Sequence, residues 1–329
     1  MTKIRWGVLS TAKIARLHTI PAIQSSALGE VVAIASRDEQ NARAQADQLG
    51  IARAYGSYEA LLNDPDIDAI YNPMPNHLHV PWSVKALEAG KHVLVEKPAG
   101  LNVADMEPLL ACAGRHPELK LMEAFMYRFH PQWQQAKQLC DEGAIGTLRT
   151  IQCAFSYNNR DADNIRNSAA MGGGALMDIG CYGISLARFL LNAEPSRVLG
   201  HMNNLDEYEV DCVTSALMEF DGAIASFTCS TKTEPEQWVE IAGDAGSIRI
   251  HIPFNPAADN GTELTLKHQG KIQMRNIEPA NHYRNMADAF AEAILHNKPV
   301  PTPMTDALDN MTVLDAIVTS ANKQSWVHL

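Results

Sequence analysis

A lysine at the end of a short apolar run is the side chain in this sequence with the clearest chemical use. Residues 90–98 read GKHVLVEKP, so Lys97 follows a predicted strand and stands between an acid and a proline. The carboxyl ends of parallel strands border the ligand crevice of an α/β sheet, and a proline stops the strand and stiffens the turn. A lysine there can polarise or protonate a substrate oxygen if its pKa falls from about 10.4 toward neutrality. The same residues are also compatible with a solvated Glu-Lys pair in a loop.

A tyrosine in the second half of the chain is the other candidate for proton transfer. Three glycines at 172–174 open an apolar run that is typical of a helix ending near Asn192. Asp178 and Tyr182 then lie one turn apart on the same helix face. A tyrosine, with a pKa of about 10, becomes a useful proton donor and acceptor when a cation such as Lys97 stabilises its phenolate. The alternative is a half-buried helix aromatic.

The first strand and turn predict a place for a pyrophosphate. Residues 4–9 form an apolar run, residues 10–15 read STAKIA, and a predicted helix continues to about Ser26. Such a unit directs backbone N–H groups and a positive helix end at a phosphate. Serine and alanine replace the glycines of a dinucleotide loop; they are small but adopt positive φ less readily. The residues expected to bind the cofactor here are Ser10, Thr11, Ala12, Lys13 and Ile14. An ordinary βα turn is the alternative.

The end of the second strand predicts which nicotinamide cofactor binds. The run at 31–35 ends in Ser36 and Arg37, where NAD-binding units carry an acid that bonds the ribose hydroxyls. A hydroxyl and a guanidinium instead suit a 2′-phosphate, so we expect NADP, with NAD possible. The competing interpretation makes Asp38 the ribose acid. Asp38 is also well placed to cap a helix that begins near Glu39.

A proline-rich turn follows the predicted strand at 67–71. Residues 72–75 read NPMP, which fixes an extended turn before the next helix. The backbone there can line the nicotinamide ribose, while Asn76 or His77 starts the helix. His77 and His79 also form an alternate-residue pair that invites a zinc interpretation. No Cys or acidic cluster with ligand spacing accompanies them, so we expect no metal.

The remaining pattern predicts the elements that position these residues. Helices at about 57–62, 77–89 and 103–113 alternate with apolar strands, which indicates a parallel sheet with right-handed crossovers. After Gly146 the strand-like runs follow one another with turns between them, which indicates a largely antiparallel sheet. These runs lie at 148–157, 196–202, 211–220, 223–230, 237–242, 246–252 and 263–268. Two late helices are expected at about 283–296 and 305–323.

We therefore expect an α/β fold with two domains. Residues 1–123 form an N-terminal Rossmann domain with a doubly wound parallel sheet, which binds the dinucleotide. Residues 124–329 form a C-terminal α+β domain with a large, mostly antiparallel open sheet, which binds substrate and mediates oligomerisation. The last helices are expected to pack back on the first domain.

With these pieces assembled, the chain resembles the glucose-fructose oxidoreductase / inositol dehydrogenase / MocA family of nicotinamide-dependent oxidoreductases. The resemblance rests on the amino-terminal βα loop and on residues 75–79, 96–98 and 172–182, whose order and spacing cover nearly the whole chain. Residues 123–131 and 163–166 are most similar to the branch that holds glucose-fructose oxidoreductase, xylose dehydrogenases, dimeric dihydrodiol dehydrogenases and sugar ketoreductases.

The resemblance implies roles for named residues. Tyr182 is the acid/base, where inositol-dehydrogenase-like members have a histidine; Lys97 is its electrostatic partner, and Asp178 orients the pair or a substrate hydroxyl. The further residues implied at the cofactor are Pro73, Asn76, His77, Glu96, Lys97 and Arg128. Those implied at the substrate are Lys97, Arg128, Asn164, Arg166, Asp178 and Tyr182. Residues 167–170 read NSAA and depart from the Leu-Asp/Gln-Pro type of sequence expected there.

The reaction implied by the resemblance is hydride transfer between NADP and a carbinol or carbonyl carbon of a sugar or related cyclic polyol. Two other functions stay open. The same fold includes glycoside hydrolases that use bound NAD transiently, and proteins thought to sense redox state without turnover. Lys97 and Tyr182 are both intact, which argues against the sensor.

Composition restricts the partners and the compartment. Acidic residues number 38 against 27 basic, so the net charge of −11 makes nucleic acid and anionic membrane unlikely partners. Six cysteines without a CxxC pair indicate reduced thiols, and no apolar stretch is expected to span a membrane. Met1 leads directly into the first strand, so we expect a cytoplasmic enzyme without an export signal. Relatives cover the open face of the sheet with a second subunit, which predicts a homodimer or homotetramer.

Overall fold

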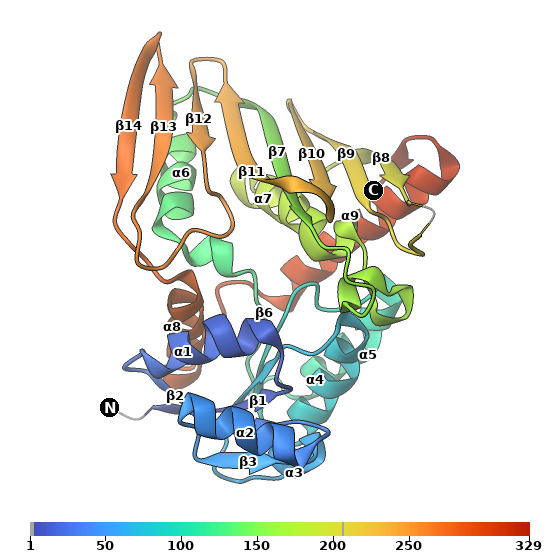
Figure 1. The fold of residues 1–329 in the computed structure, drawn as a ribbon. Coiled ribbons are helices and arrows are strands. Elements are labelled where there is room, and N and C mark those ends of the chain that lie inside the picture. The colour runs from blue at the N-terminus through green and yellow to red at the C-terminus, as the bar shows by residue number, and fades with distance from the viewer. Residues whose placement is uncertain (1–2, 206) are drawn as a thin grey trace. The chain divides into compact units, whose positions relative to one another are not determined.

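A parallel six-stranded sheet forms the core of the first half of the chain (Figure 1). The computed structural model describes residues 3–205 and 207–329. The strand order β3-β2-β1-β4-β5-β6 is that of a doubly wound dinucleotide-binding sheet, so the predicted Rossmann architecture is confirmed. The strands are β1 (Ile4–Leu9), β2 (Gly29–Ala35), β3 (Arg53–Tyr55), β4 (Ala69–Asn72), β5 (His92–Val95) and β6 (Leu121–Glu123).

Helices connect these strands as right-handed crossovers require. The first is one continuous helical stretch, with a π-helical part η1 (Ala15–Thr19) followed by α1 (Ile20–Gln24). The others are α2 (Glu39–Leu49), α3 (Tyr58–Leu62), the 3₁₀ turn η2 (Asn76–Leu78), α4 (His79–Glu88) and α5 (Val103–Arg115). Each strand's carboxyl end therefore leads into a loop and a helix start, which is where the predicted cofactor residues lie.

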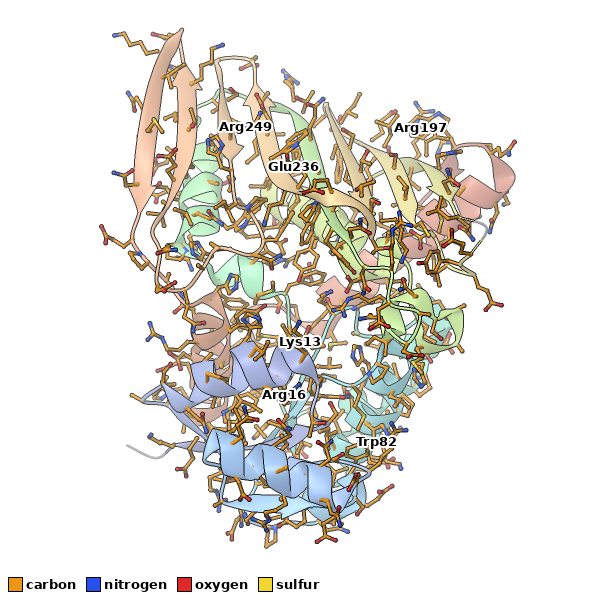
Figure 2. All side chains as sticks on the ribbon, viewed as in Figure 1. Lys13, Arg16, Trp82, Arg197, Glu236 and Arg249 are labelled. Carbon is orange, nitrogen blue, oxygen red and sulfur yellow. The ribbon has the colours of Figure 1, made fainter. Side chains whose placement is uncertain are left out.

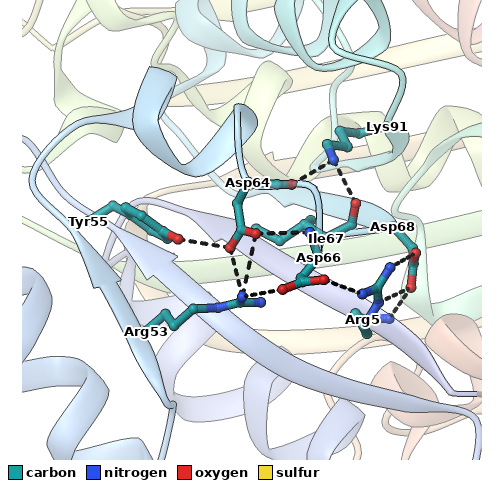
Figure 3. Close-up of polar contacts among 8 residues, drawn as sticks. All are labelled: Arg5, Arg53, Tyr55, Asp64, Asp66, Ile67, Asp68 and Lys91. Atoms are coloured by element: carbon teal, nitrogen blue, oxygen red, sulfur yellow. Dashed lines mark hydrogen bonds and ion pairs between the residues drawn. The ribbon is translucent and has the colours of Figure 1, made fainter.

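An ion cluster closes the opposite, amino-terminal edge of this sheet (Figure 3). Arg5 bonds the carboxylates of Asp66 and Asp68 at 3.0 and 2.7 Å. The buried amino group of Lys91 donates to the backbone carbonyls of Asp64 and Ile67, both at 2.8 Å. We call this set the basal ion cluster; its members are Arg5, Arg53, Tyr55, Asp64, Asp66, Asp68 and Lys91. It fixes the segment that leads into β4.

The second sheet has nine strands in the order β14-β13-β12-β11-β7-β10-β9-β8-β15. Neighbours are antiparallel except β7 and β10, which pair in parallel, so the predicted mostly antiparallel sheet is confirmed. The strands are β7 (Leu148–Asn158), β8 (Arg197–Asn203), β9 (Val213–Phe220), β10 (Ala223–Ser230), β11 (Lys232–Gly243), β12 (Gly246–Ile250), β13 (Thr262–His268), β14 (Lys271–Ile277) and β15 (Val327–His328). The last two strands were not predicted.

Helices cover one face of this sheet. They are α6 (Pro131–Asp141), the π-helical η6 (Leu176–Gly180), α7 (Cys181–Leu191) and most of α9 (Met304–Lys323), together with short turns η3 (Met126–Phe129), η4 (Ile165–Asn167) and η5 (Ala169–Met171). At Gly183 a Cβ atom would lie 2.7 Å from the Phe227 ring, so glycine lets α7 approach β10 closely. The core lies between α7 and the buried side chains of β7, β9 and β10.

One apolar segment resembles a membrane span by its length and composition. Residues 169–191 form a helical segment that is long and apolar enough to cross a membrane by length and composition alone. In the structure, 83% of its apolar window is buried inside the protein. It is apolar because it is the core helix of the second sheet, so its composition reflects burial in protein.

The chain divides into two compact units. The first comprises Met1–Met126 and Asn281–Leu308, and the second comprises Tyr127–Ala280 and Asp309–Leu329. The late helix α8 (His282–Leu295) belongs to the first unit, where it packs on α1 and β2. Most of α9 belongs instead to the second unit, because Gly200 of β8 lets its backbone approach closely.

Candidate active site

The loop after β1 has the shape of an anion-binding turn. Ser10 adopts a positive φ of 83°, and its hydroxyl accepts a hydrogen bond from the N–H of Ala12 at 3.3 Å. The helix then begins at Lys13, whose side chain is exposed (Figure 2). Arg16, one turn later, donates from Nε to the carbonyl of Thr11 at 2.9 Å. The predicted residues from Ser10 to Ile14 thus lie at a helix start with backbone N–H groups available to a phosphate.

The side-chain amide of Asn41 links the loop after β2 to the loop after β1. Asn41 donates to the hydroxyls of Thr11 at 3.1 Å and Ser36 at 3.4 Å. Asp38 caps α2, because its carboxylate accepts from the N–H groups of Gln40 and Asn41 at 2.9 and 3.3 Å. The cap uses one oxygen, Oδ1, of the acid in the competing interpretation.

Arg37 remains the charged group at the end of β2. Its side chain is exposed, and it lies close enough to Tyr58 to bond the phenol oxygen and oppose the rise in the pKa of Tyr58 that burial causes. A guanidinium at this position suits a 2′-phosphate. Ser36 and Arg37 thus both lie at the end of β2, where the sequence predicts that they bind the 2′-phosphate of NADP.

The loop after β4 is fixed by a buried asparagine. Asn72 donates to the carbonyl of His79 at 3.0 Å and to the hydroxyl of Ser83 at 3.1 Å. Pro73 and the residues up to Pro75 form the extended turn that was predicted, and the half-buried Asn76 and His77 open η2. The Nδ1 atom of His77 is buried without a hydrogen-bond partner in the part of the chain that the structure describes.

The loop after β5 carries Glu96 and Lys97, both half-buried. The carboxylate of Glu96 accepts a hydrogen bond of 2.6 Å from the fully buried hydroxyl of Tyr71, which accepts in turn from Thr19 at 3.0 Å. Burial and the Glu96 carboxylate both raise the pKa of Tyr71, which keeps its phenol protonated. The Lys97–Pro98 peptide bond is cis. The four strands β1, β2, β4 and β5 thus bring their predicted residues to one edge of one sheet.

In the second unit a carboxylate lies at the centre of the predicted substrate residues. Asp178 accepts hydrogen bonds from the Tyr157 hydroxyl at 2.5 Å and from Nε of Arg166 at 2.9 Å. Asp178 raises the pKa of Arg166, and burial together with Asp178 raises the pKa of Tyr157. Both neighbours are therefore hydrogen-bond donors at neutral pH, and the Asp178 carboxylate accepts from both of them.

Tyr182 lies one turn after Asp178, as expected. Only 4% of its surface is exposed, and its ring packs against Phe155 and Phe254 with centroids 5.6 and 5.1 Å apart. The charge of Arg166 interacts with the Tyr182 phenol. This rigid aromatic surround holds the phenol in one place, as a proton-transfer group requires.

Two other predicted residues are held by local bonds. Arg128 donates from Nη2 to the Ser185 hydroxyl of α7 at 2.9 Å, and its guanidinium lies over the Phe189 ring. The side-chain oxygen of Asn164 accepts from the N–H of Arg166 at 3.1 Å and caps η4. Asn164 therefore shapes the turn that presents Arg166.

Two residues near this site were missed from the sequence. Tyr157 is the second-last residue of β7. Only the alternation of side chains between the two faces of the strand could have indicated that it faces Asp178. Lys232 is buried, donates to the Asn159 carbonyl and to Oδ1 of Asn167 at 2.6 Å, and lies 3.8 Å from the centroid of a tyrosine ring. No local sequence signal shows that Lys232 holds the segment 159–167.

Among residues 3–205 and 207–329, no group of three or more His, Cys, Asp or Glu side chains could hold a metal ion. The ring nitrogens of His79 each face a backbone carbonyl, at 2.7 Å. His79 is therefore not oriented as a zinc ligand beside His77.

Two family models match the chain. Residues 4–125 match the model described as oxidoreductase family, NAD-binding Rossmann fold, and residues 133–249 match the GFO/IDH/MocA C-terminal domain. The chain is 42% identical to an uncharacterized oxidoreductase of Rhizobium meliloti, over 99% of each chain. It is 37% identical to a D-xylose 1-dehydrogenase (NADP(+)) of Haloferax volcanii, over 98% of this chain and 99% of that protein.

A solved structure extends the comparison. The fold is similar to that of a 3-ketoreductase from Actinomadura kijaniata, crystallised with NADP and TDP-benzene, with a TM-score of 0.92 and 32% identity. The match covers 97% of this chain and 98% of that one.

Proposed function

Because the chain belongs to the GFO/IDH/MocA family of oxidoreductases, we propose that it transfers a hydride between NADP and a carbinol or carbonyl carbon of a sugar or related cyclic polyol. The observation that carries this proposal is the match, along nearly the whole length, to a D-xylose 1-dehydrogenase that uses NADP. The match to the 3-ketoreductase, which was crystallised with NADP, supports the same reaction class.

The residues of the first unit fit a nicotinamide dinucleotide. The helix start after Ser10 suits a pyrophosphate, and Arg37 suits a 2′-phosphate. The buried Nδ1 of His77, unpartnered among the described residues, suits a further polar contact. We assign cofactor binding to these residues together with Pro73, Asn76 and Glu96. When bound, the nicotinamide accepts or donates the hydride.

We assign the proton transfer to Tyr182 and the support of its charge to Lys97. Removal of a hydride from a carbinol carbon requires its hydroxyl proton to leave, and the Tyr182 phenolate accepts that proton. The role we assign to the Lys97 ammonium is to stabilise the phenolate. In the reductive direction the phenol returns the proton to the carbonyl oxygen.

Substrate orientation is assigned to the cluster around Asp178. Because Tyr157 and Arg166 both donate to the same carboxylate oxygen, the position of Asp178 is fixed. A fixed carboxylate accepts hydrogen bonds from sugar hydroxyls, and Arg166 and Arg128 donate to sugar oxygens.

A panel of substrates tests the proposed function. Aldoses, sugar lactones, keto-sugars and dihydrodiols are each supplied with NADP(H) and with NAD(H), and nicotinamide absorbance is followed. We expect turnover of at least one sugar or cyclic polyol, faster at low cofactor concentration with NADP. A protein that binds NADP but turns over none of them would be a sensor. Release of free sugar from a glycoside without net change in absorbance would indicate a hydrolase.

We also propose a cytoplasmic homo-oligomer formed through the open face of the nine-stranded sheet. That face exposes Leu217 and Ile224 on neighbouring strands and Ile272 and Met274 on β14. It also carries a cavity of about 710 Å³ between β7, β8, β9, β10 and β11. Exposed apolar surface of this kind is typical of subunit interfaces.

Light scattering tests the assembly. We expect a dimer or a tetramer at micromolar concentration, and a smaller species for Leu217→Glu, whose side chain is 39% exposed on this face. The control is Ser196→Glu, an exposed position before β8 that is outside the cavity lining. A monomeric parent protein would contradict the proposal.

A further inference from the structure

His79 is a buried polar residue that the reaction assigned above does not use. It is the first residue of α4, and 1% of its surface is exposed. Its Nδ1 lies 2.7 Å from the carbonyl oxygen of Pro98, and its Nε2 lies 2.7 Å from the carbonyl oxygen of Met74. One ring therefore touches the two loops that follow β4 and β5.

These two loops carry the residues assigned to the cofactor and to the proton relay. Met74 lies two residues before Asn76, and Pro98 directly follows Lys97. Asn72 supports the arrangement, because its amide holds the His79 carbonyl at 3.0 Å and its oxygen accepts from the N–H of Met74 at 3.3 Å. The imidazole is thus itself fixed by the sheet.

The chemistry of the ring limits what it can hold at one time. Carbonyl oxygens only accept hydrogen bonds, whereas a neutral imidazole has one N–H donor. Burial lowers the pKa of His79 to about 4, although the contacts with the Pro98 and Met74 carbonyls raise it, so the ring is neutral at pH 7. The Nδ1–H tautomer bonds Pro98 and the Nε2–H tautomer bonds Met74.

We propose that His79 is a positioning residue for the proposed oxidoreductase reaction. In the Nδ1–H tautomer it holds the Pro98 carbonyl and thereby places Lys97. In the Nε2–H tautomer it holds the Met74 carbonyl and thereby places the loop with Asn76 and His77. This inference rests on the proposed function, and it assigns separate effects to the two ring nitrogens.

Two substitutions separate the two contacts. The amide nitrogen of asparagine lies near the position of Nδ1, and that of glutamine lies near the position of Nε2. His79→Asn therefore keeps a donor for Pro98 and loses the one for Met74, whereas His79→Gln does the reverse. His296→Gln, an exposed histidine at the end of α8, is the control.

The readouts are the Kd for NADP by calorimetry, which needs no substrate, and kcat on the best substrate of the panel. An unsatisfied buried carbonyl costs about 5- to 150-fold in the step that it supports. We expect His79→Asn to weaken NADP binding by such a factor with kcat within about threefold, and His79→Gln to lower kcat with Kd within about threefold. Equal losses of both quantities in both variants, or no loss in either, would overturn the proposal.

Two further results keep the test decisive. If the parent protein binds NADP but turns over no substrate, the proposed function fails while the effect of His79→Asn on Kd still tests the contact with Met74. If the variants do not fold, ¹⁵N-histidine NMR of the parent protein replaces them. We expect a neutral His79 ring from pH 5 to pH 9 with one slowly exchanging N–H, since its pKa is about 4. A ring that titrates near its ordinary pKa of about 6.5 and exchanges freely would refute the buried contacts.

Discussion

Two lysines flank the same strand, β5, and differ in almost every other respect. Lys91 precedes the strand, is 7% exposed, and donates hydrogen bonds to the backbone carbonyls of Asp64 and Ile67. Lys97 follows the strand, is half-buried, and lies in the loop of Glu96 and Pro98. The amino-terminal edge of the sheet has its charges paired within the protein, whereas the carboxyl edge keeps groups that suit a ligand. The first edge should therefore govern stability and the second activity.

The largest expected effect is the loss of activity at Lys97. Lys97→Ala removes the cation that supports the Tyr182 phenolate, and general acid–base groups contribute about 10²–10⁴-fold, so kcat should fall by that order. Tyr182→Phe should have a similar effect while NADP still binds. The double variant should lose far less than the product of the two effects, because residues that act as a unit are non-additive.

Steady-state kinetics and NADP calorimetry on the three variants measure this coupling. Near-parental turnover in Tyr182→Phe would transfer the acid/base role to Asp178 or to a histidine such as His77. Full multiplicative losses in the double variant would show that Lys97 and Tyr182 act independently.

The next effect concerns cofactor choice at the carboxyl edge. Arg37→Ala should weaken NADP binding by about 10- to 150-fold, which is the value of a charge-assisted hydrogen bond of about 1.5–3 kcal/mol. NAD lacks the 2′-phosphate, so its Kd should stay unchanged in the same titration. Equal dissociation constants for the two cofactors in the parent protein would contradict this assignment.

The matching change at the amino-terminal edge should affect stability alone. Lys91→Met keeps the apolar stem and leaves the carbonyls of Asp64 and Ile67 without this donor, at a cost of about 1–3 kcal/mol of unfolding free energy. Urea denaturation measures that loss, and kcat should stay within about twofold of the parent value. A Lys91→Met protein of parental stability with impaired kcat would reverse the comparison between the two edges.

The parallel sheet and the place of Lys97 could be predicted because both follow from local sequence pattern. The alternation of strands and helices predicts the sheet, and a strand's carboxyl end predicts where Lys97 lies. It could not predict that Lys91 bonds a loop some 25 residues away, or that His79 bonds two loops, because such partners are set by the tertiary fold. The edge strand β14 was not predicted because most of its side chains are exposed. It therefore lacks the alternation of apolar, buried residues with polar, exposed ones that indicates a strand.

The second unit shows the same limit. The glycine-rich run and the helical spacing predict that Asp178 and Tyr182 share a helix face. The bonds of Asp178 to Tyr157 and Arg166 come from segments about 20 and 12 residues earlier, and the capping by Asn164 is visible only once η4 is formed. Local pattern thus predicts the helix that carries Asp178 and Tyr182 but not the partners of Asp178.

Acid should weaken the basal ion cluster. Burial opposes ionisation of Asp68, but its bonds from Arg5 outweigh that effect and hold the pKa of Asp68 below its usual value. A lowered folded-state pKa contributes stability above the unfolded pKa of about 3.9, and this stability is lost as pH falls through the folded value. Asp68→Asn should therefore lower the unfolding free energy at pH 7 by about 1 kcal/mol and flatten its decline between pH 5 and pH 3.

Urea titrations across that pH range measure the decline. Asp66→Asn is the matched control, because its carboxylate is 62% exposed and should contribute less. An acid-dependent decline that is the same in Asp68→Asn and in the parent would place the titrating groups elsewhere.

The smallest effect is expected at Ser10, at the carboxyl edge of the sheet, where a strained backbone conformation lowers the unfolding free energy. A φ of 83° is strained for any residue with a Cβ, and the bond from the Ala12 N–H to the Ser10 hydroxyl offsets part of that strain. Ser10→Gly relieves the strain but adds flexibility to the unfolded chain, so the net gain in unfolding free energy should be about 0.5 kcal/mol. Ser10→Ala keeps the strain and loses the hydroxyl, so it should be less stable than Ser10→Gly by about 1 kcal/mol. Thermal unfolding without cofactor ranks the stabilities of the parent protein and the two variants. An alanine variant as stable as the glycine variant would show that this loop is not strained. The two edges of the sheet would then differ only in how their charges are paired.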